Sequence, residues 1–145
     1  MIKIRVERVI NKTPEEVFDA ISDHENYKRF PRFNDSKLLQ PGKTEKNGLG
    51  ARRYISAGSS SVEEIITCFE RPSRMDYHVE VMKPAIPMIH TKGEVTMVPH
   101  NGKTKVVWIS EGHIEIPILG FILEKISNRL GSRLFDGVLK YIDQH

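Results

Sequence analysis

The last quarter of the chain, from Pro117 to about Asp143, has an apolar pattern that only a long helix satisfies. Its apolar residues recur at steps of three and four and are Leu119, Leu123, Ile126, Leu130 and Leu134, continued by Val138, Tyr141 and Ile142. This spacing predicts one amphipathic helix. At 1.5 Å per residue the helix would be about 40 Å long. An apolar stripe of that length and breadth requires a broad apolar partner.

The segments before this helix read mostly as strands. Residues 2–7 alternate apolar and charged side chains, which predicts a strand with one covered face. From Phe33 the period is again two, and glycine, proline and serine turns separate strands predicted at 33–40, 50–57, 61–70, 74–82, 89–98 and 104–114. The partner of the long helix is therefore expected to be a sheet.

Two short helices are predicted between the first two strands. Thr13-Pro14-Glu15-Glu16 has the form of a capped helix start, with proline at the first helical position. Asp23 is expected to cap a second helix, which Pro31 ends. The order of strand, two helices, six strands and a long helix makes this an α+β chain.

The turn Asn101-Gly102 fixes the register of one predicted hairpin. Asn-Gly favours a two-residue type I′ turn, which places His100 opposite Lys103. Counting outward gives the interior pairs Met97–Val106 and Val95–Trp108 and the exterior pair His90–His113. We assign the interior face to the side next to the long helix.

The register of strand 61–70 stays open. A tight turn at Pro72-Ser73 would place Ile66 opposite Val79 and would turn Glu64 toward the interior. A slip of one residue would instead turn Phe69, Ile65 and Glu63 inward.

Composition narrows the class of protein. A chain of 145 residues is expected to form a single domain, residues 1–145. Its net charge of +3 comes from interspersed signs without an aromatic-rich basic patch, which argues against nucleic-acid binding. Ile116–Leu123 is the longest apolar run and is too short to span a membrane. The amino-terminal residues resemble no targeting signal, so we expect a cytoplasmic protein.

The sequence predicts neither a metal nor a cofactor. Cys68 is the single cysteine, so the chain can form no internal disulfide and no thiolate cluster. No third ligand joins His90 and His113, whereas zinc takes three or four protein ligands. No nucleotide fingerprint, phosphate-binding glycine loop or Ser-His-Asp set stands out.

Several short segments, taken together and in order, resemble the START-like (SRPBCC) superfamily, and specifically its polyketide cyclase/dehydrase and lipid-transport branch. They are residues 13–18, 27–31, 47–50, 62–65, 70–72 and 102–108, followed by the long helix. The resemblance covers the whole chain and implies a helix-grip fold, in which a curved seven-stranded antiparallel sheet wraps around the C-terminal helix. It also implies an apolar cavity for lipids, quinones, sterols or polyketides, but no catalytic residues, since the polar lining differs between branches.

A cavity between this helix and sheet would draw its lining from the inward-facing positions. The candidate ligand-binding residues are Tyr54, Glu64, Ile66, Tyr77, Val79, Val95, Met97 and Trp108 from the strands, and Leu123, Ile126, Leu130 and Leu134 from the helix. Tyr54, Tyr77 and Trp108 offer flat surfaces with a hydrogen-bond donor at one end. The same side chains can also simply fill a core.

Glu64 is the candidate catalytic residue. A carboxyl group facing an apolar cavity can act as a general acid or bind a ligand hydroxyl. Arg53, on the neighbouring predicted strand, could pair with Glu64 and keep it ionised. Alternatively, Glu63 and Glu64 both reach solvent at the end of a strand.

Three functions follow from these observations. The first is binding of a hydrophobic small molecule such as a lipid, quinone or polyketide, as a carrier or sensor. The second is an enzyme of the cyclase, dehydratase or hydrolase type that uses Glu64 or a tyrosine. The third is an interaction protein, because the superfamily that the chain resembles includes ribosome-association toxins and chaperone co-activators, and the apolar segment 84–89 suits a partner contact. The oligomeric state stays open.

Overall fold

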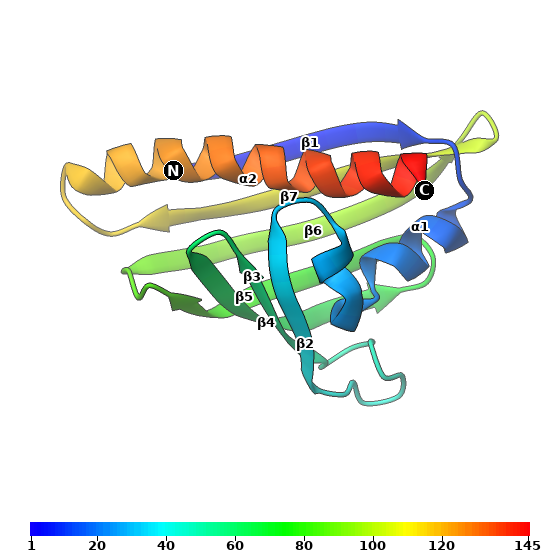
Figure 1. Cartoon of the computed structure of the whole chain (residues 1–145), viewed down its shortest axis with the longest axis horizontal. Coiled ribbons are helices and arrows are strands. Elements are labelled where there is room, and N and C mark those ends of the chain that lie inside the picture. Colours follow the sequence, from blue (N-terminus) through cyan, green and yellow to red (C-terminus); the bar gives the residue numbers. More distant parts are fainter.

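The computed structural model describes residues 1–145 and consists of one antiparallel sheet, one long helix and two short helices (Figure 1). The elements are β1 (Ile2–Ile10), α1 (Pro14–Ile21), η1 (His24–Arg29), β2 (Phe33–Gln40), β3 (Arg52–Ala57), β4 (Ser60–Glu70), β5 (Arg74–Lys83), β6 (Met88–His100), β7 (Lys103–Ile114) and α2 (Leu119–Gln144). The strand order is β1-β7-β6-β5-β4-β3-β2. The prediction of an α+β helix-grip fold with seven strands is confirmed.

The two short helices carry the chain from one edge of the sheet to the other, because β1 and β2 are the edge strands. Thr13 caps α1 as predicted, since its Oγ1 accepts a hydrogen bond from the Glu16 amide at 3.2 Å. The predicted cap at Asp23 is wrong: no side-chain bond caps η1, and the Asp23 carboxylate binds the side-chain amide of Asn26 instead.

Strand β4 combines both of the open registers. Ile66 pairs with Tyr77 and Glu64 with Val79, two residues away from the first register, so the inward face is unchanged. A bulge between Ile66 and Cys68 then reverses the alternation, and Phe69 packs against the core as well. Glu64 therefore faces the interior of the fold.

The hairpin of β6 and β7 confirms the pairs Met97–Val106 and Val95–Trp108. The predicted pair His90–His113 is wrong, because a bulge between His90 and Lys92 shifts the register by one residue. His113 pairs with Ile89 instead, and His90 turns inward, where it is buried.

Helix α2 lies along the edge strand β1 and is fixed there by polar side chains (Figure 1). The Glu124 carboxylate accepts hydrogen bonds from the terminal amino group of Met1 at 2.6 Å and from the Ile114 amide at 2.9 Å. The Asn128 side chain accepts one from the Lys3 amide at 2.7 Å. The bond from Lys3 satisfies part of the hydrogen-bonding edge that β1 would otherwise expose.

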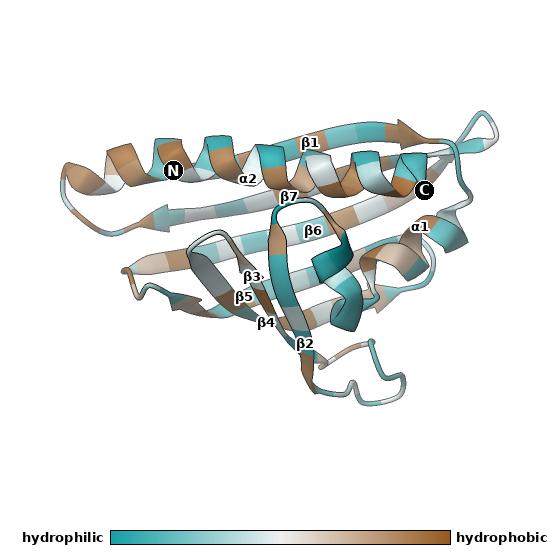
Figure 2. Cartoon of the chain, viewed as in Figure 1, coloured by the Kyte–Doolittle hydropathy of each residue, from teal (hydrophilic) through white to brown (hydrophobic).

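Only the C-terminal half of α2 buries its apolar stripe. Val138, Leu139 and Ile142 are buried, whereas Ile126 and Leu130 are 49% and 57% exposed. Figure 2 shows apolar residues along the whole helix, including its N-terminal half. The prediction that the full stripe packs on the sheet is therefore wrong for that half. No helix, α2 included, is long and apolar enough to cross a membrane.

Two of the three glycines within α2, Gly131 and Gly137, give a test of how closely it packs. A methyl group at Gly137 would have Cβ of Pro31 as its nearest neighbour, at 4.0 Å, so Gly137→Ala should stabilise the fold by about 0.5–1 kcal/mol through helix propensity. At Gly131 the methyl group would collide with Cδ1 of Ile4, so Gly131→Ala should be neutral or destabilising. Urea unfolding measures both, and an equal gain at the two positions would contradict the packing of α2 on β1.

Candidate functional site

A cavity of about 820 Å³ lies between α2 and the sheet and has 21 lining residues, 11 of them hydrophobic. Its wall comes from α2 between Ser127 and Phe135, from the start of β2, and from the hairpin that joins β3 to β4. Tyr27, Val62, Glu64, Tyr77, Met82 and Trp108 complete the lining. This volume falls within the usual range of small-molecule sites, about 300–1,000 Å³.

Five of the predicted ligand-binding residues line this cavity: Glu64, Tyr77, Trp108, Leu130 and Leu134. Among the other predicted residues, Ile66, Val95 and Met97 are almost fully buried and belong to the solid core. Val79, Leu123 and Ile126 lie outside the lining. The part of α2 that lines the cavity begins at Ser127, and Leu123 and Ile126 precede it.

Tyr54 also lies outside the lining, on the opposite face of β3. Its neighbours Arg53 and Ile55 are buried, and successive side chains of a strand point to opposite faces. The Tyr54 ring instead lies 5.6 Å from Nζ of Lys37. Its expected place in the cavity is therefore corrected.

The prediction missed several apolar residues that line the cavity. They are Tyr27, Phe33, Ile55, Val62, Met82 and Phe135. Alternation along the strands places Ile55 and Val62 on the same face as Arg53 and Glu64, so this signal was present in the sequence. Nothing comparable fixes Tyr27, which lies in the short helix η1. Phe135 stacks on Trp108 with ring centroids 4.3 Å apart and covers one face of the indole.

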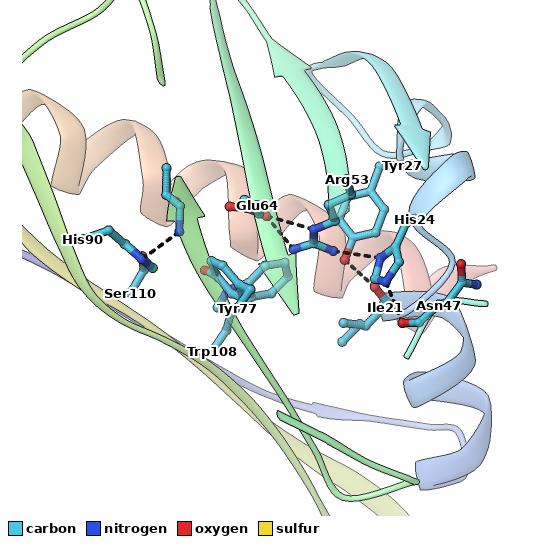
Figure 3. Close-up of polar contacts among 11 residues, drawn as sticks. Ile21, His24, Tyr27, Asn47, Arg53, Glu64, Tyr77, His90, Trp108 and Ser110 are labelled. Atoms are coloured by element: carbon cyan, nitrogen blue, oxygen red, sulfur yellow. Dashed lines mark hydrogen bonds and ion pairs between the residues drawn. The ribbon is translucent and has the colours of Figure 1, made fainter. Parts of the chain in front are cut away.

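Glu64 lines the inner wall as one member of a buried ion pair, with Arg53 behind it (Figure 3). Arg53 on β3 and Glu64 on β4 are paired across the two strands, and only 1% and 7% of their surfaces are exposed. The Nε and Nη2 atoms of Arg53 lie 2.9 and 2.8 Å from Oε1 of Glu64. The sequence alternative in which Arg53 pairs with Glu64 is confirmed, and the one that sends Glu64 to solvent is wrong.

Aromatic rings and a histidine surround the guanidinium of Arg53. The rings of Tyr27 and Tyr77 lie 5.0 and 5.4 Å from it. Nη1 of Arg53 donates to Nδ1 of His24 at 3.1 Å, so the imidazole carries its proton on Nε2 and donates to the Asn47 carbonyl at 2.8 Å. Burial, aided by the charge of Arg53, lowers the pKa of His24 to about 3.

The second oxygen of Glu64 is open toward the cavity. Both bonds from Arg53 end on Oε1, and Oε2 points away from Arg53 and makes no hydrogen bond within the chain (Figure 3). The neighbouring Tyr77 hydroxyl accepts a hydrogen bond from Nε1 of Trp108 at 2.9 Å. Burial raises the pKa of Tyr77, so its phenol stays protonated. The wall thus offers a ligand an acceptor on a buried residue that no group of the chain occupies.

His90 fills the space where β5 and β6 separate, beyond the short stretch in which Asp76 pairs with Glu94. Its Nδ1 accepts a hydrogen bond from the Val79 amide at 3.2 Å, and its Nε2 donates to Oγ of Ser110 at 3.1 Å. Burial, followed by the nearby His78, lowers the pKa of His90 to about 4. No three His, Cys, Asp or Glu side chains are grouped closely enough to hold a metal ion.

The ion pair predicts a large stability cost when one partner is removed. Glu64→Gln leaves the buried Arg53 cation without a counter-charge, so we expect a loss of about 3–5 kcal/mol in the free energy of unfolding. Glu63→Gln is the matched control, because Glu63 is only half-buried and belongs to no ion pair. Denaturant unfolding of both variants measures the difference, and equal losses would contradict the pairing.

The two buried histidines predict acid sensitivity. An unfolded imidazole binds a proton near pH 6.5, whereas folded His90 does so only near pH 4. Between pH 6.5 and 4 the unfolded state therefore binds more protons than the folded state. As the pH is lowered through this range, the free energy of unfolding should decrease by up to about 1.4 kcal/mol per pH unit for each histidine. His90→Gln should reduce this slope between pH 6.5 and 4, and His100→Gln, at an exposed turn, should not.

The comparisons with known proteins agree with this architecture. The structure of TTHA0849 from Thermus thermophilus superimposes with a TM-score of 0.79 at 20% identity, covering 98% of this chain and 94% of the other. A START superfamily protein from Mycobacterium smegmatis gives 0.76 at 11% identity, covering 98% and 97%. The di-domain ARO/CYC StfQ from the steffimycin biosynthetic pathway gives 0.79 at 11% identity, and the match covers 99% of this chain but 49% of StfQ.

At such identities these structures share the fold alone. Comparison with curated protein sequences gave no match. The family described as "Polyketide cyclase / dehydrase and lipid transport" matches residues 1–143, which is nearly the whole sequence. The chain therefore belongs to the polyketide cyclase/dehydrase and lipid-transport family, with the START-like fold.

Proposed function

We propose that this protein binds a hydrophobic small molecule, as a carrier or sensor, in the cavity between α2 and the sheet. The observation that carries the proposal is an apolar cavity of about 820 Å³ whose wall includes one open acceptor on a buried charged residue, Oε2 of Glu64. Burial of an apolar ligand surface against Trp108, Phe135 and Leu134 supplies the driving force, about 25 cal/mol per Å².

The open oxygen of Glu64 favours ligands that carry a hydrogen-bond donor. An apolar ligand without one would cover Oε2 and leave a desolvated acceptor unpaired, which costs binding energy. A quinone presents only carbonyl oxygens to this position. A hydroxylated lipid or a phenolic polyketide fits the wall better.

The same oxygen favours one alternative, an enzyme of the cyclase or dehydratase type. Arg53 is a permanent cation held against Oε1, so Glu64 is better suited to take a proton from a bound substrate than to give one. With a polyketide substrate, Glu64→Gln would then lower kcat by about 100-fold while the folded variant still binds. A loss of less than about tenfold would exclude Glu64 as the base.

A cavity-filling variant tests the binding proposal. Leu130 lines the cavity and is 57% exposed, so Leu130→Trp can extend into the empty space without overpacking a core. We expect its affinity for the neutral apolar probe 1-N-phenylnaphthylamine to fall about tenfold or more, as measured by fluorescence titration. Ile126→Trp is the matched control, because Ile126 lies one turn earlier, is similarly exposed and lies outside the lining.

Equal binding by the two variants would place the probe elsewhere and contradict the proposal. Native mass spectrometry of freshly purified protein gives an independent readout. We expect an adduct with the mass of a small apolar molecule, and we expect Leu130→Trp to lose it while Ile126→Trp retains it.

A further inference from the structure

Two arginines without ionic partners line the cavity, both at its solvent-facing side. Arg32 precedes β2, and Arg133 lies on the middle of α2; both are exposed. Neither side chain forms an ion pair or a hydrogen bond within the chain, unlike Arg29, which pairs with Asp23, and Arg8, which pairs with Asp136. The two guanidinium groups are therefore available to a ligand.

The remaining charges of the lining do not neutralise these arginines. Glu64 is the only acidic residue that lines the cavity, and its charge is balanced by Arg53 behind it. Because arginine is charged at every accessible pH, the mouth of the cavity carries two uncompensated positive charges.

Hydroxyl groups lie on the same rim. The hairpin of β3 and β4 contributes Ser59, in its turn, and Ser60 and Ser61, at the start of β4, to the lining, and their hydroxyls make no hydrogen bond within the chain. The side-chain amide of Asn34 donates to the carbonyl of Gly58 at 2.8 Å and so ties the start of β2 to this turn. Guanidinium and hydroxyl donors together are the usual partners of carboxylate and phosphate oxygens.

The backbone at the rim is also unusual. Arg32 has a φ of 72°, in the left-handed region that residues with a side chain seldom occupy. Such conformations cost energy, and beyond turns they cluster at ligand-binding and catalytic sites. In this protein the residue with the left-handed conformation, Arg32, is one of the two arginines that have no ionic partner.

Resting on the binding function proposed above, we propose that the ligand is an amphiphile with an anionic head group, a carboxylate or a phosphate ester, held at the mouth by Arg32 and Arg133. Its apolar body extends inward along Trp108 and Phe135. The carboxylate of Glu64 repels an anion from the inner wall and accepts a hydrogen bond from a hydroxyl on the body of the ligand. The charges of the cavity thus fix the orientation of the ligand as well as its class.

Displacement of 1-N-phenylnaphthylamine by matched twelve-carbon competitors tests this proposal. 12-Hydroxydodecanoate and 1,12-dodecanediol share the chain and the inner hydroxyl and differ in the charge of one end. 12-Hydroxydodecyl phosphate is the second anion, and it separates preference for a phosphate from preference for a carboxylate. We expect at least one anion to displace the probe at a concentration about fivefold to tenfold below that of the diol, and the preference to shrink as salt rises.

The arginine variants identify the groups responsible. Arg32→Gln and Arg133→Gln should each reduce the preference for the anion over the diol, and the double variant should abolish it, because displacement by the anion weakens more than displacement by the diol. Arg129→Gln is the control, because Arg129 is an exposed arginine of α2 outside the lining. A wild-type protein that binds the probe but does not distinguish either anion from the diol would overturn the head-group proposal. Failure to bind the probe at all would instead overturn the binding function.

Discussion

The ion pair of Arg53 and Glu64 is the constraint on which the cavity depends. Two charges with 1% and 7% exposure must stay together, because separating them would leave a desolvated charge in the wall. A buried pair adds little net stability compared with well-packed apolar residues. It does, however, prevent the wall from closing, since apolar side chains that collapsed onto Oε2 of Glu64 would cover an acceptor that has no other partner. The pair thus keeps open a space that a purely apolar wall could fill.

Helix α2 contributes the second condition for an open cavity. Its position is set by polar contacts with the edge strand, through Glu124 and Asn128 near its start and through Asp143 near its end, where the Asn11 amide donates to the carboxylate at 2.9 Å. Apolar packing is densest in the C-terminal half, around Leu139, and Leu123 adds a partly buried contact near the start. The helix therefore lies against β1 at Gly131 and against Trp108 at Phe135, while Leu130 and Leu134 face the cavity. The exposure of Leu130 follows from this arrangement, because its partner is the cavity and not the sheet.

The fold could be predicted because its signals are local and repeated. Period-two alternation located the strands, the cap at Thr13 located α1, and the Asn101-Gly102 turn paired Val95 with Trp108 correctly. The site was less accessible to such reasoning. A bulge has no signature in the alternation of polar and apolar residues, so His90 was assigned to the wrong face. The chemistry of Tyr54 suits a binding site, but its position between the buried Arg53 and Ile55 places the ring on the opposite face of β3. An apolar pattern also shows which side chains are buried, but not whether they pack against one another or line a cavity. Val95 and Met97 fill the core, whereas Leu134, with the same kind of pattern, faces the cavity.

The charges of the lining, more than the fold, decide what this member of the family can hold. Solved structures at 11–20% identity share its architecture, so the architecture alone cannot distinguish one ligand class from another. Along this cavity the sign of the charge changes, from the unpaired Arg32 and Arg133 at the rim to the open oxygen of Glu64 within. An apolar molecule gains from the space between them in either orientation. A molecule with an acid at one end and a hydroxyl toward the other gains binding energy in only one orientation. In the reversed orientation its acid group would lie against the carboxylate of Glu64 in the inner wall. Specificity here arises as much from that repulsion as from the attraction at the rim.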